Sequence, residues 1–330
     1  MKLFSSDYCG RLQATADAAI WLSHRDTYHW LYRRTTSNPP PEEDYVASLI
    51  VRALPQIDSA WQPLFRQWNL TLRLTGVFCH QTPKARYQYL KKTVSPELAD
   101  LLIVRRRETR THQVRQVATL VQAKMSETGE IRLGSNDPQL HLLEQWPALN
   151  IIGPNAPKDL LCIGRFDGQA MYAGIQKGWS PCPDTNKAWA AFCPWGMMRP
   201  KHHGWVDDPF SLYLVRMLNF EVGREFFDPN ATGCHWSLLI DYLLKTTFSM
   251  PLRTRDIRRD PDFVRGKTIA INRLGFTSSA ARTSSAYVPA ARVSNLSGNG
   301  DSIPPDDDSR EFDEGGMGRV VIIETSEVEG

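Results

Sequence analysis

Three polar side chains lie at the ends of apolar segments. A buried strand would not normally carry polar side chains of this kind. Asp100 directly precedes the run Leu101–Val104, and Gln122 and Lys124 close the run that begins at Val117. A buried strand should not carry an unpaired acid or lysine, because an unpaired charge is costly away from water. Gln122 and Lys124 are two positions apart, so on a strand they point to the same face. An antiparallel partner strand can place Asp100 beside them.

Together these side chains suit the hydrolysis of a phosphodiester bond with help from a metal ion. Mg²⁺ prefers oxygen ligands, and proteins usually supply only one or two carboxylates to it. Asp100 can supply a carboxylate and Gln122 a side-chain carbonyl, and the peptide carbonyl of Ala123 is a further candidate ligand. Lys124 can hold the attacking water or neutralise the phosphate as charge develops. The sequence therefore predicts that Asp100 and Gln122 bind Mg²⁺ or Mn²⁺ and that Lys124 assists.

The hydrophobic pattern predicts the elements that would position these residues. Apolar residues at helical spacing predict a helix over 9–36 and another from Glu42, which Pro55 interrupts before a further helical segment. Alternation from Leu70 to Phe78 predicts a strand, and the runs beside Asp100 and Gln122 predict two more. A helix over 139–146 and strands over 149–152 and 170–175 complete the pattern. The predicted order is helix, three strands, helix, strand.

The segment Pro96-Glu97-Leu98-Ala99-Asp100, followed by Gln122-Ala123-Lys124, resembles the signature of the PD-(D/E)XK nuclease superfamily. The element order over 42–175 is similar to that of its restriction-endonuclease-like core. The resemblance implies an α/β fold and a Mg²⁺-dependent deoxyribonuclease. It implies that Asp100 is the acid of the second core strand, that Gln122 takes the position usually held by Asp or Glu, and that Lys124 is the lysine. Glu42 or Glu43 matches an acid that some members carry on the first helix.

Gln122 is the departure from that pattern. A neutral amide removes one negative charge from the metal site, so metal affinity should be weaker, although some members of the superfamily use Gln here. Glu97 restores a catalytic carboxylate if the strand begins after it, which Pro96 allows. A structural alternative is that Asp100 caps a loop and pairs with Lys124. Functional alternatives are a catalytically inactive nucleic-acid-binding or scaffold subunit on the same fold, or a structural subunit whose Trp-rich second half contacts proteins.

Further residues near the predicted site are candidates for binding nucleic acid. His80 and Gln81 end the strand that begins at Leu70 and could contact the scissile phosphate. Arg105, Arg106 and Arg107 are expected in a basic turn between the two motif-bearing strands, where they could follow a phosphate backbone. The alternative for these arginines is a solvated turn with no ligand.

Composition and charge limit the kind of protein and the cellular location in which such a site would work. The chain has 330 residues and a net charge of only +3, so a nucleic-acid surface must be local. No apolar run is long enough to span a bilayer, no secretory signal is recognised, and six scattered cysteines favour reduced thiols in a cytoplasm. The expected partners are DNA and other protein subunits, as in a prokaryotic defence or restriction-type system, with an oligomer also compatible.

The chain divides by composition into five predicted regions. Residues 1–41 are predicted to form a helical extension, and residues 42–175 a nuclease-like core. Residues 176–276 are predicted to form a Trp/Pro-rich and mostly helical elaboration. Residues 277–316, which are rich in small and polar residues, are expected to be a flexible and disordered linker, and residues 317–330 a strand-like tail. The tail is expected to dock as a strand on the body of the protein or on a partner.

Overall fold

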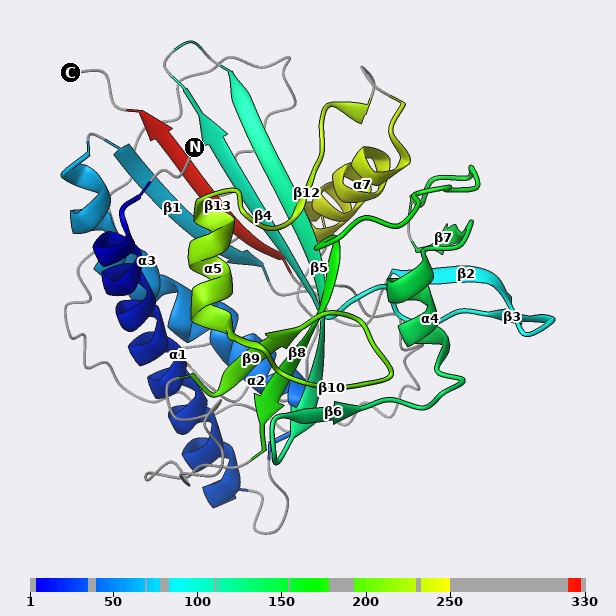
Figure 1. Cartoon of the computed structure of the whole chain (residues 1–330), viewed down its shortest axis with the longest axis horizontal. Helices are drawn as coiled ribbons and strands as arrows, with labels where there is room; N and C mark the ends of the chain where they lie inside the picture. The colour runs from blue at the N-terminus through cyan, green and yellow to red at the C-terminus, as the bar shows by residue number, and fades with distance from the viewer. Residues whose placement is uncertain are drawn as a thin grey trace, which may run out of the picture.

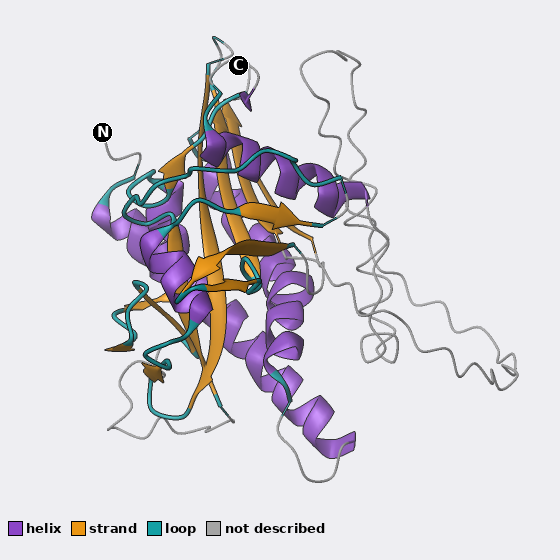
Figure 2. Ribbon diagram, turned by 90° about the vertical axis from the view of Figure 1, so that its right-hand side faces the viewer, coloured by secondary structure: helices purple, strands orange, loops and turns teal. Residues whose placement is uncertain are grey.

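A computed structural model describes residues 4–34, 40–68, 70–77, 83–109, 111, 113–153, 155–177, 193–229, 233–249 and 320–327. Within these residues the chain is mixed α/β, built around an eight-stranded mixed sheet with helices on both of its sides (Figures 1 and 2). The α/β class expected from the sequence is therefore confirmed.

The sheet joins strands that lie far apart in the sequence. Its path is β1 (Leu70–Val77), β13 (Val320–Glu327), β4 (Leu101–Glu108), β5 (Val114–Ser126), β8 (Ala170–Gln176), β9 (Trp195–Met198) and β11 (Asp208–Pro209), and β12 (Arg224–Glu225) also pairs with β5. β13 is antiparallel to β1 and parallel to β4, and β5 is antiparallel to β4 and parallel to β8. The predicted C-terminal strand thus docks on the body, between β1 and β4, a position that its place in the sequence does not suggest.

Each face of the sheet packs against its own helices because neighbouring residues of a strand point to opposite faces. Leu101 and Ile103 belong to one hydrophobic core, and Leu102 and Val104 to the other. The first core includes α1 (Ser6–Arg34), α2 (Glu42–Ser48), α3 (Leu54–Arg66) and α5 (Phe210–Leu218). The second includes α4 (Pro138–Gln145) and α7 (His235–Ser249). The motif-bearing strands are consequently buried on both faces.

A π-helical segment, η1 (Leu49–Ala53), lies between α2 and α3. The backbone stays helical from Glu42 to Arg66, so the prediction that Pro55 interrupts the helix is wrong. In the wide turn the Leu54 N–H donates to the Leu49 carbonyl, five residues back. Pro55 then occupies the first turn of α3, where a residue without an N–H group is tolerated.

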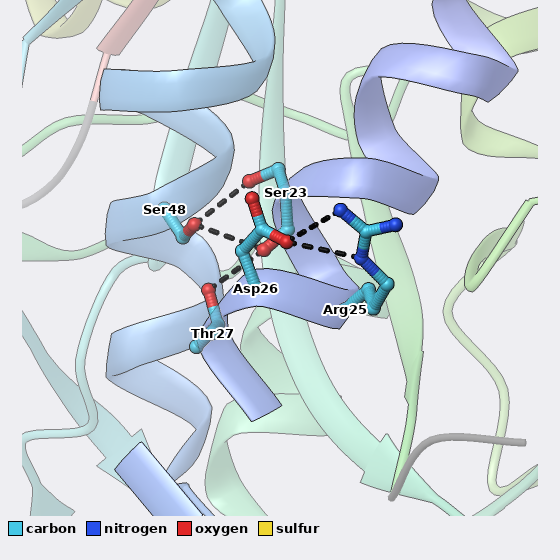
Figure 3. Close-up of polar contacts among 5 residues, drawn as sticks. All are labelled: Ser23, Arg25, Asp26, Thr27 and Ser48. Atoms are coloured by element: carbon cyan, nitrogen blue, oxygen red, sulfur yellow. Dashed lines mark hydrogen bonds and ion pairs between the residues drawn. The ribbon is translucent and has the colours of Figure 1, made fainter. Parts of the chain in front are cut away.

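Buried hydroxyl groups hold α2 against α1 (Figure 3). The Ser23 and Ser48 hydroxyl oxygens are 2.7 Å apart, and Ser48 Oγ also donates to the Ser23 carbonyl at 3.2 Å. Thr27 Oγ1 donates to the same carbonyl at 2.9 Å. All three side chains are buried, whereas the neighbouring Arg25–Asp26 ion pair is exposed. This contact anchors the helix whose first turn carries Glu42 and Glu43.

Two small sheets lie beside the main one. One consists of β3 (Lys92–Val94), β2 (Lys84–Tyr89) and β7 (Asn150–Ile152), and the other of β10 (His203–Trp205) and β6 (Glu130–Arg132). The β2–β3 hairpin occupies a segment for which the sequence predicts no strand. Its turn residues Leu90 and Lys91 have φ angles of 48° and 63°. A two-residue turn with both φ angles positive normally selects Asn and Gly, so its usual sequence signal is absent here.

Elements from several of the predicted regions share the main sheet and one of its cores. β9 and β11 extend the main sheet beyond residue 175, and α1 packs in the same core as α2 and α3. The expected linker at 277–316 lies outside the described residues. No helix among the described residues has the length and apolar character to cross a membrane.

Candidate functional site

Asp100 lies where strand β4 begins and its ladder with β5 ends. The last paired residues are Leu101 and Val121, and the Asp100 N–H donates to the Val121 carbonyl at 3.1 Å. Continued pairing in this register would place Ala99 opposite Ala123. Instead, Asp100 Oδ2 accepts a hydrogen bond from the Ala123 N–H at 2.8 Å. The carboxylate thus takes the place of a backbone carbonyl.

The ladder ends here because the preceding residues pair with a different strand. Glu97 forms an antiparallel bridge with Lys84, and the Ala85 N–H donates to the Pro96 carbonyl at 2.9 Å. Strand β4 begins only at Leu101. Glu97 is therefore outside the strand, as its proposed role required, and the Asp100 carboxylate bonds to an amide of strand β5, not to a loop.

Gln122 connects Asp100 to helix α4. Its side chain is buried, with 2% of its surface exposed. Gln122 Nε2 donates to Asp100 Oδ2, while Gln122 Oε1 accepts from Gln139 Nε2. The sequence predicted that the Gln122 carbonyl would face a cation together with the Asp100 carboxylate, but the amide nitrogen takes that position. This is the favourable orientation beside a carboxylate, because N–H groups stabilise its negative charge.

The first turn of α4 holds Gln139 in place. Asp137 Oδ1 accepts from the backbone N–H groups of Gln139 and Leu140 at 2.7 and 3.2 Å. Pro138 occupies the start of the helix, and the Tyr87 hydroxyl donates to its carbonyl. An N-cap of this kind satisfies amide groups that the helix leaves unpaired. Gln139 Nε2 also donates to the Glu97 carbonyl at 3.2 Å, so this side chain joins α4 to β5 and to the segment that precedes β4.

The charges around Glu97 show which ionisable groups share this environment. Burial raises the pKa of the Glu97 carboxyl, and the negative charges of Asp100 and Glu43 raise it further. The ammonium groups of Lys124 and Lys84 act in the opposite direction. Residues from α2, β2, β5 and the entry to β4 are therefore electrostatically coupled, and the predicted residues Glu97, Asp100, Gln122 and Lys124 are brought together.

The residue types of this cluster fit an oxygen-preferring cation such as Mg²⁺, because Asp100, Glu97 and Glu43 all carry carboxyl groups. Among the described residues, no three or more His, Cys, Asp and Glu side chains gather as a metal-binding group. As the Gln122 amide stands, its oxygen is not directed at the Asp100 carboxylate. The donor chemistry of Asp100 and Glu97 suits such a cation, and these two carboxylates are the residues that would hold it.

The residues predicted to bind nucleic acid do not join this cluster among the described residues. His80 and Gln81 lie outside the described residues. Arg105, Arg106 and Arg107 are in strand β4, not in a turn, which corrects their predicted position. Arg105 is 1% exposed, with its guanidinium bonded to the Leu218 carbonyl at 3.3 Å and other internal acceptors, so it is not presented to a phosphate backbone.

Arg106 and Arg107 stand toward the far end of the strand from the candidate site. They are six and seven residues along β4 from Asp100, or roughly 20 Å at about 3.3 Å per residue. Arg106 also forms an ion pair with Glu108 at 3.6 Å. The cations that share the environment of Glu97 are instead Lys84 and Lys124.

Sequence reasoning missed Gln139 and Lys84. A glutamine in a first helical turn has no chemical signature by itself, and its role depends on where α4 docks. Lys84 begins a strand that the sequence analysis did not recognise, although the spacing of Ala85, Tyr87 and Tyr89 offered a period-two signal.

Buried Tyr172 also went unnoticed. It is the partner of Gln122 in the parallel pairing of β5 and β8. Burial raises the pKa of its hydroxyl, and Asp137 and Asp100 add to the rise. Among the described residues this hydroxyl has no hydrogen-bond partner.

Comparison with known proteins identified no similar protein. No protein-family model, curated protein sequence or solved structure matches the chain.

Proposed function

We propose that this protein is a Mg²⁺-dependent nuclease that hydrolyses DNA phosphodiester bonds on a restriction-endonuclease-like core. The observation that supports it most is the hydrogen bond between Gln122 and Asp100 at the end of one antiparallel strand pair. Lys124 lies two positions further along β5, and its ammonium group acts on the pKa of the nearby Glu97 carboxyl, as do Asp100 and Glu43. Carboxylates beside a lysine suit the charge changes of phosphodiester hydrolysis.

The arrangement of elements is compatible with such a core. β4 and β5 are antiparallel, and β8, which follows α4 in the chain, lies parallel to β5. The helices α2 and α3 and strand β1 precede them. This is the predicted order of helix, three strands, helix and strand, with β13 inserted between β1 and β4 and additional short strands in the connections.

The residues take complementary roles in the proposed reaction. Asp100 and Glu97 would hold the cation, and Glu43 from α2 would add negative charge nearby. When bound, Mg²⁺ supplies positive charge for the phosphate and lowers the pKa of a coordinated water. Lys124 orients the attacking water or neutralises the phosphate as its charge grows, and Lys84 adds a second positive charge. Gln122 keeps the Asp100 carboxylate in place through its amide group.

Incubation of the full chain with plasmid and linear DNA in Mg²⁺ or Mn²⁺ tests this proposal. Asp100→Asn keeps an acceptor for the Ala123 N–H, and Lys124→Met keeps the length of the side chain, so both should fold. We expect each to lower cleavage about 100-fold or more, and chelation of the cation to abolish it. Lys245→Met, on the exposed face of α7, is the matched control. Cleavage unchanged in both site variants would refute the assignment.

A second candidate is a subunit of the same fold that binds nucleic acid without cutting it. The orientation of Gln122 favours it, since the amide N–H stabilises Asp100 without a cation. Salt-sensitive DNA binding that persists in Asp100→Asn, together with no cleavage in either metal, would select this function. In either case, targeting by other subunits of a prokaryotic defence or restriction-type system is part of the proposal, by analogy with the fold.

A further inference from the structure

The β2–β3 hairpin carries positive charge that no acid of the same segment balances. Residues 84–96 contain four lysine or arginine side chains and neither Asp nor Glu, whereas the net charge of the whole chain is only +3. Lys84 and Arg86 lie on strand β2. Lys91 lies in the turn, and Lys92 begins β3. Arg86, Lys91 and Lys92 are exposed and form no ion pair with another described residue. The hairpin is therefore a local cationic surface, which a nucleic-acid-binding protein of low net charge needs.

One face of this hairpin packs on the body of the protein, and the other face is free. The Tyr87 and Tyr89 rings lie toward α4, with their centres 5.6 and 4.4 Å from that of the His141 ring. Pairing of β2 with β7 fixes the root of the hairpin. Because neighbouring residues point to opposite faces of a strand, Arg86 and Gln88 point away from this contact, and both are exposed. Figure 1 shows the hairpin projecting from one side of the molecule, beyond α4. The cations are thus carried on a supported arm.

The tip of the hairpin has a turn sequence that its backbone does not favour. Leu90 and Lys91 both have positive φ angles, where Asn and Gly are the usual residues. Leu90 is also 62% exposed, so packing in a core does not account for a leucine at this position. Backbone strain without a packing benefit points to a role for the tip itself. An exposed apolar side chain followed by two lysines suits a DNA groove, because apolar groups contact base edges while lysines reach the phosphates.

We propose that the β2–β3 hairpin is an arm that binds double-stranded DNA, with its cations on the phosphates and Leu90 in a groove. A two-stranded ribbon fits the major groove of B-DNA. Lys84, at the root, shares the electrostatic environment of Glu97 in the candidate site. Leu90 lies six residues further along, or roughly 20 Å at about 3.3 Å per residue. The arm therefore leads outward from the candidate site. This inference rests on the proposed function for the identity of its ligand, and it requires no metal ion.

An anionic membrane is the other surface that lysines beside a leucine could meet. A single leucine offers little apolar area for insertion into a bilayer, and stable attachment normally needs a larger apolar face. The continuity of the arm with the candidate site also favours DNA. We therefore expect the full chain to bind a DNA duplex and not to bind vesicles that contain phosphatidylserine.

Fluorescence anisotropy of a labelled mixed-sequence duplex, with the full chain in EDTA, measures binding apart from cleavage. We expect the double variant Lys91→Gln, Lys92→Gln to bind about tenfold or more weakly at physiological salt. The slope of log affinity against log salt should become shallower by about 2, because two phosphate contacts are lost. Arg11→Gln with Arg66→Gln is the matched control, since it removes the same charge from α1 and α3, which pack in the other core. It should change affinity less than about twofold, because distant exposed charges are screened.

Leu90→Asn tests the tip without weakening the hairpin. Asparagine is favoured at a positive φ angle, so urea denaturation should show a stability equal to or higher than that of the wild type. We expect the affinity for the duplex to fall about threefold or more, because the apolar contact in the groove is lost. A loss of affinity in a variant that is at least as stable cannot come from unfolding.

The arm is refuted if the lysine double variant keeps wild-type affinity, or if the Arg11 and Arg66 control loses as much. Binding of the vesicles but not of the duplex, or of neither, refutes it as well, and unchanged affinity in Leu90→Asn refutes the contact of the tip. Failure of the proposed nuclease is distinguishable. If the protein never cleaves DNA in Mg²⁺ or Mn²⁺ but binds it in EDTA through the two lysines, the nuclease fails and the arm stands. If the lysine double variant cleaves limiting DNA as the wild type does, the nuclease stands and the arm fails.

Discussion

Asp100 has a structural role where β4 begins, and it would keep this role alongside any chemical one. Its Oδ2 accepts from the Ala123 N–H and from Gln122 Nε2. A buried strand amide left without an acceptor costs free energy comparable to a lost hydrogen bond. A loss of activity in Asp100→Ala would therefore mix two effects, and the asparagine variant is the better probe of chemistry.

Asp100→Ala should destabilise the protein, whereas Asp100→Asn should be nearly neutral. The alanine leaves the Ala123 N–H and the Gln122 amide without their acceptor, at a cost of about 1–3 kcal/mol in the free energy of unfolding. The asparagine oxygen can replace one carboxylate oxygen, so we expect a loss of less than about 1 kcal/mol. Urea denaturation measures both, and equal losses would contradict the capping role.

The raised pKa of Glu97 predicts a pH-dependent stability. A carboxyl whose pKa is higher in the folded state contributes stability that is complete below its ordinary value of 4.5 and is lost as the pH rises through the folded value. Glu97→Gln should remove this loss. The stability of the variant relative to wild type should therefore increase with pH above about 4.5, and then level off. Thermal unfolding from pH 4 to pH 8 tests it, and a difference that is flat or falls would contradict it.

The contact between Asp100 and Gln122 could be predicted from the sequence, but the direction of the amide could not. Strand register follows from two apolar runs and the turn between them. In this direction the Gln122 nitrogen faces Asp100 and its oxygen accepts from Gln139, which lies 17 positions away on a helix that packs against the sheet. Such a contact is a property of tertiary packing, and no local pattern encodes it.

Strand β4 begins at the candidate site and carries a buried arginine, Arg105, near its middle. Arg105 donates to the Leu218 carbonyl at 3.3 Å and to Thr325 Oγ1 at 2.7 Å, so it links β4 to α5 and β13. Its guanidinium also lies 4.7 Å from the centre of the Phe220 ring, and that of Arg115 lies 4.6 Å from the same ring. Arg105 is therefore a structural element of the sheet.

Arg105→Met should destabilise the protein by about 2–4 kcal/mol, because it leaves buried acceptors on two other elements without a donor. Arg105→Lys should recover part of the loss, since a lysine keeps the charge without the planar fork of donors. Arg115→Met is the control: its ion pair with Glu225 is exposed, and its loss should cost about 1 kcal/mol or less. Chemical denaturation ranks the three variants, and equal effects of the two methionine variants would count against this role of Arg105.

At the level of elements, the sequence pattern predicted helices and strands correctly where amphipathic or apolar runs were long. It failed where contacts with distant residues determine the local structure. The main helices and β1, β4 and β5 follow from apolar spacing. The β2–β3 hairpin was missed because Leu90 and Lys91 adopt φ angles that these residues rarely adopt. The arginines of β4 were placed in a turn because charged residues are rarely buried, and only the acceptors from α5 and β13 make Arg105 tolerable there.

Strand β13 completes the main sheet by pairing with both β1 and β4. β13 pairs along its length with β1 on one side and β4 on the other. Ile323 is fully buried and Thr325 nearly so. Without this strand, β1 and β4 would each present an unpaired edge in the middle of the sheet, which invites aggregation.

Cutting the chain inside residues 277–316, at an inserted protease site, should leave β13 attached. Its hydrogen bonds to two strands and its buried side chains should hold the fragment without a covalent link. We expect the two pieces to elute together from a gel-filtration column. In Ile323→Asp, which places a charge in the core, the fragment should separate. Separation of the unsubstituted protein after cutting would show that β13 is weakly held.

The position of β13 also sets the order of events during synthesis. A ribosome produces β1 and β4 more than 200 residues before the strand that joins them. Until β13 has been synthesised, the nascent chain holds two open strand edges that this strand covers later. Contacts between such distant residues also form slowly, because a long loop must close first. Premature termination between residues 108 and 320 would therefore yield a polypeptide that contains β1 and β4 but has an unfinished sheet.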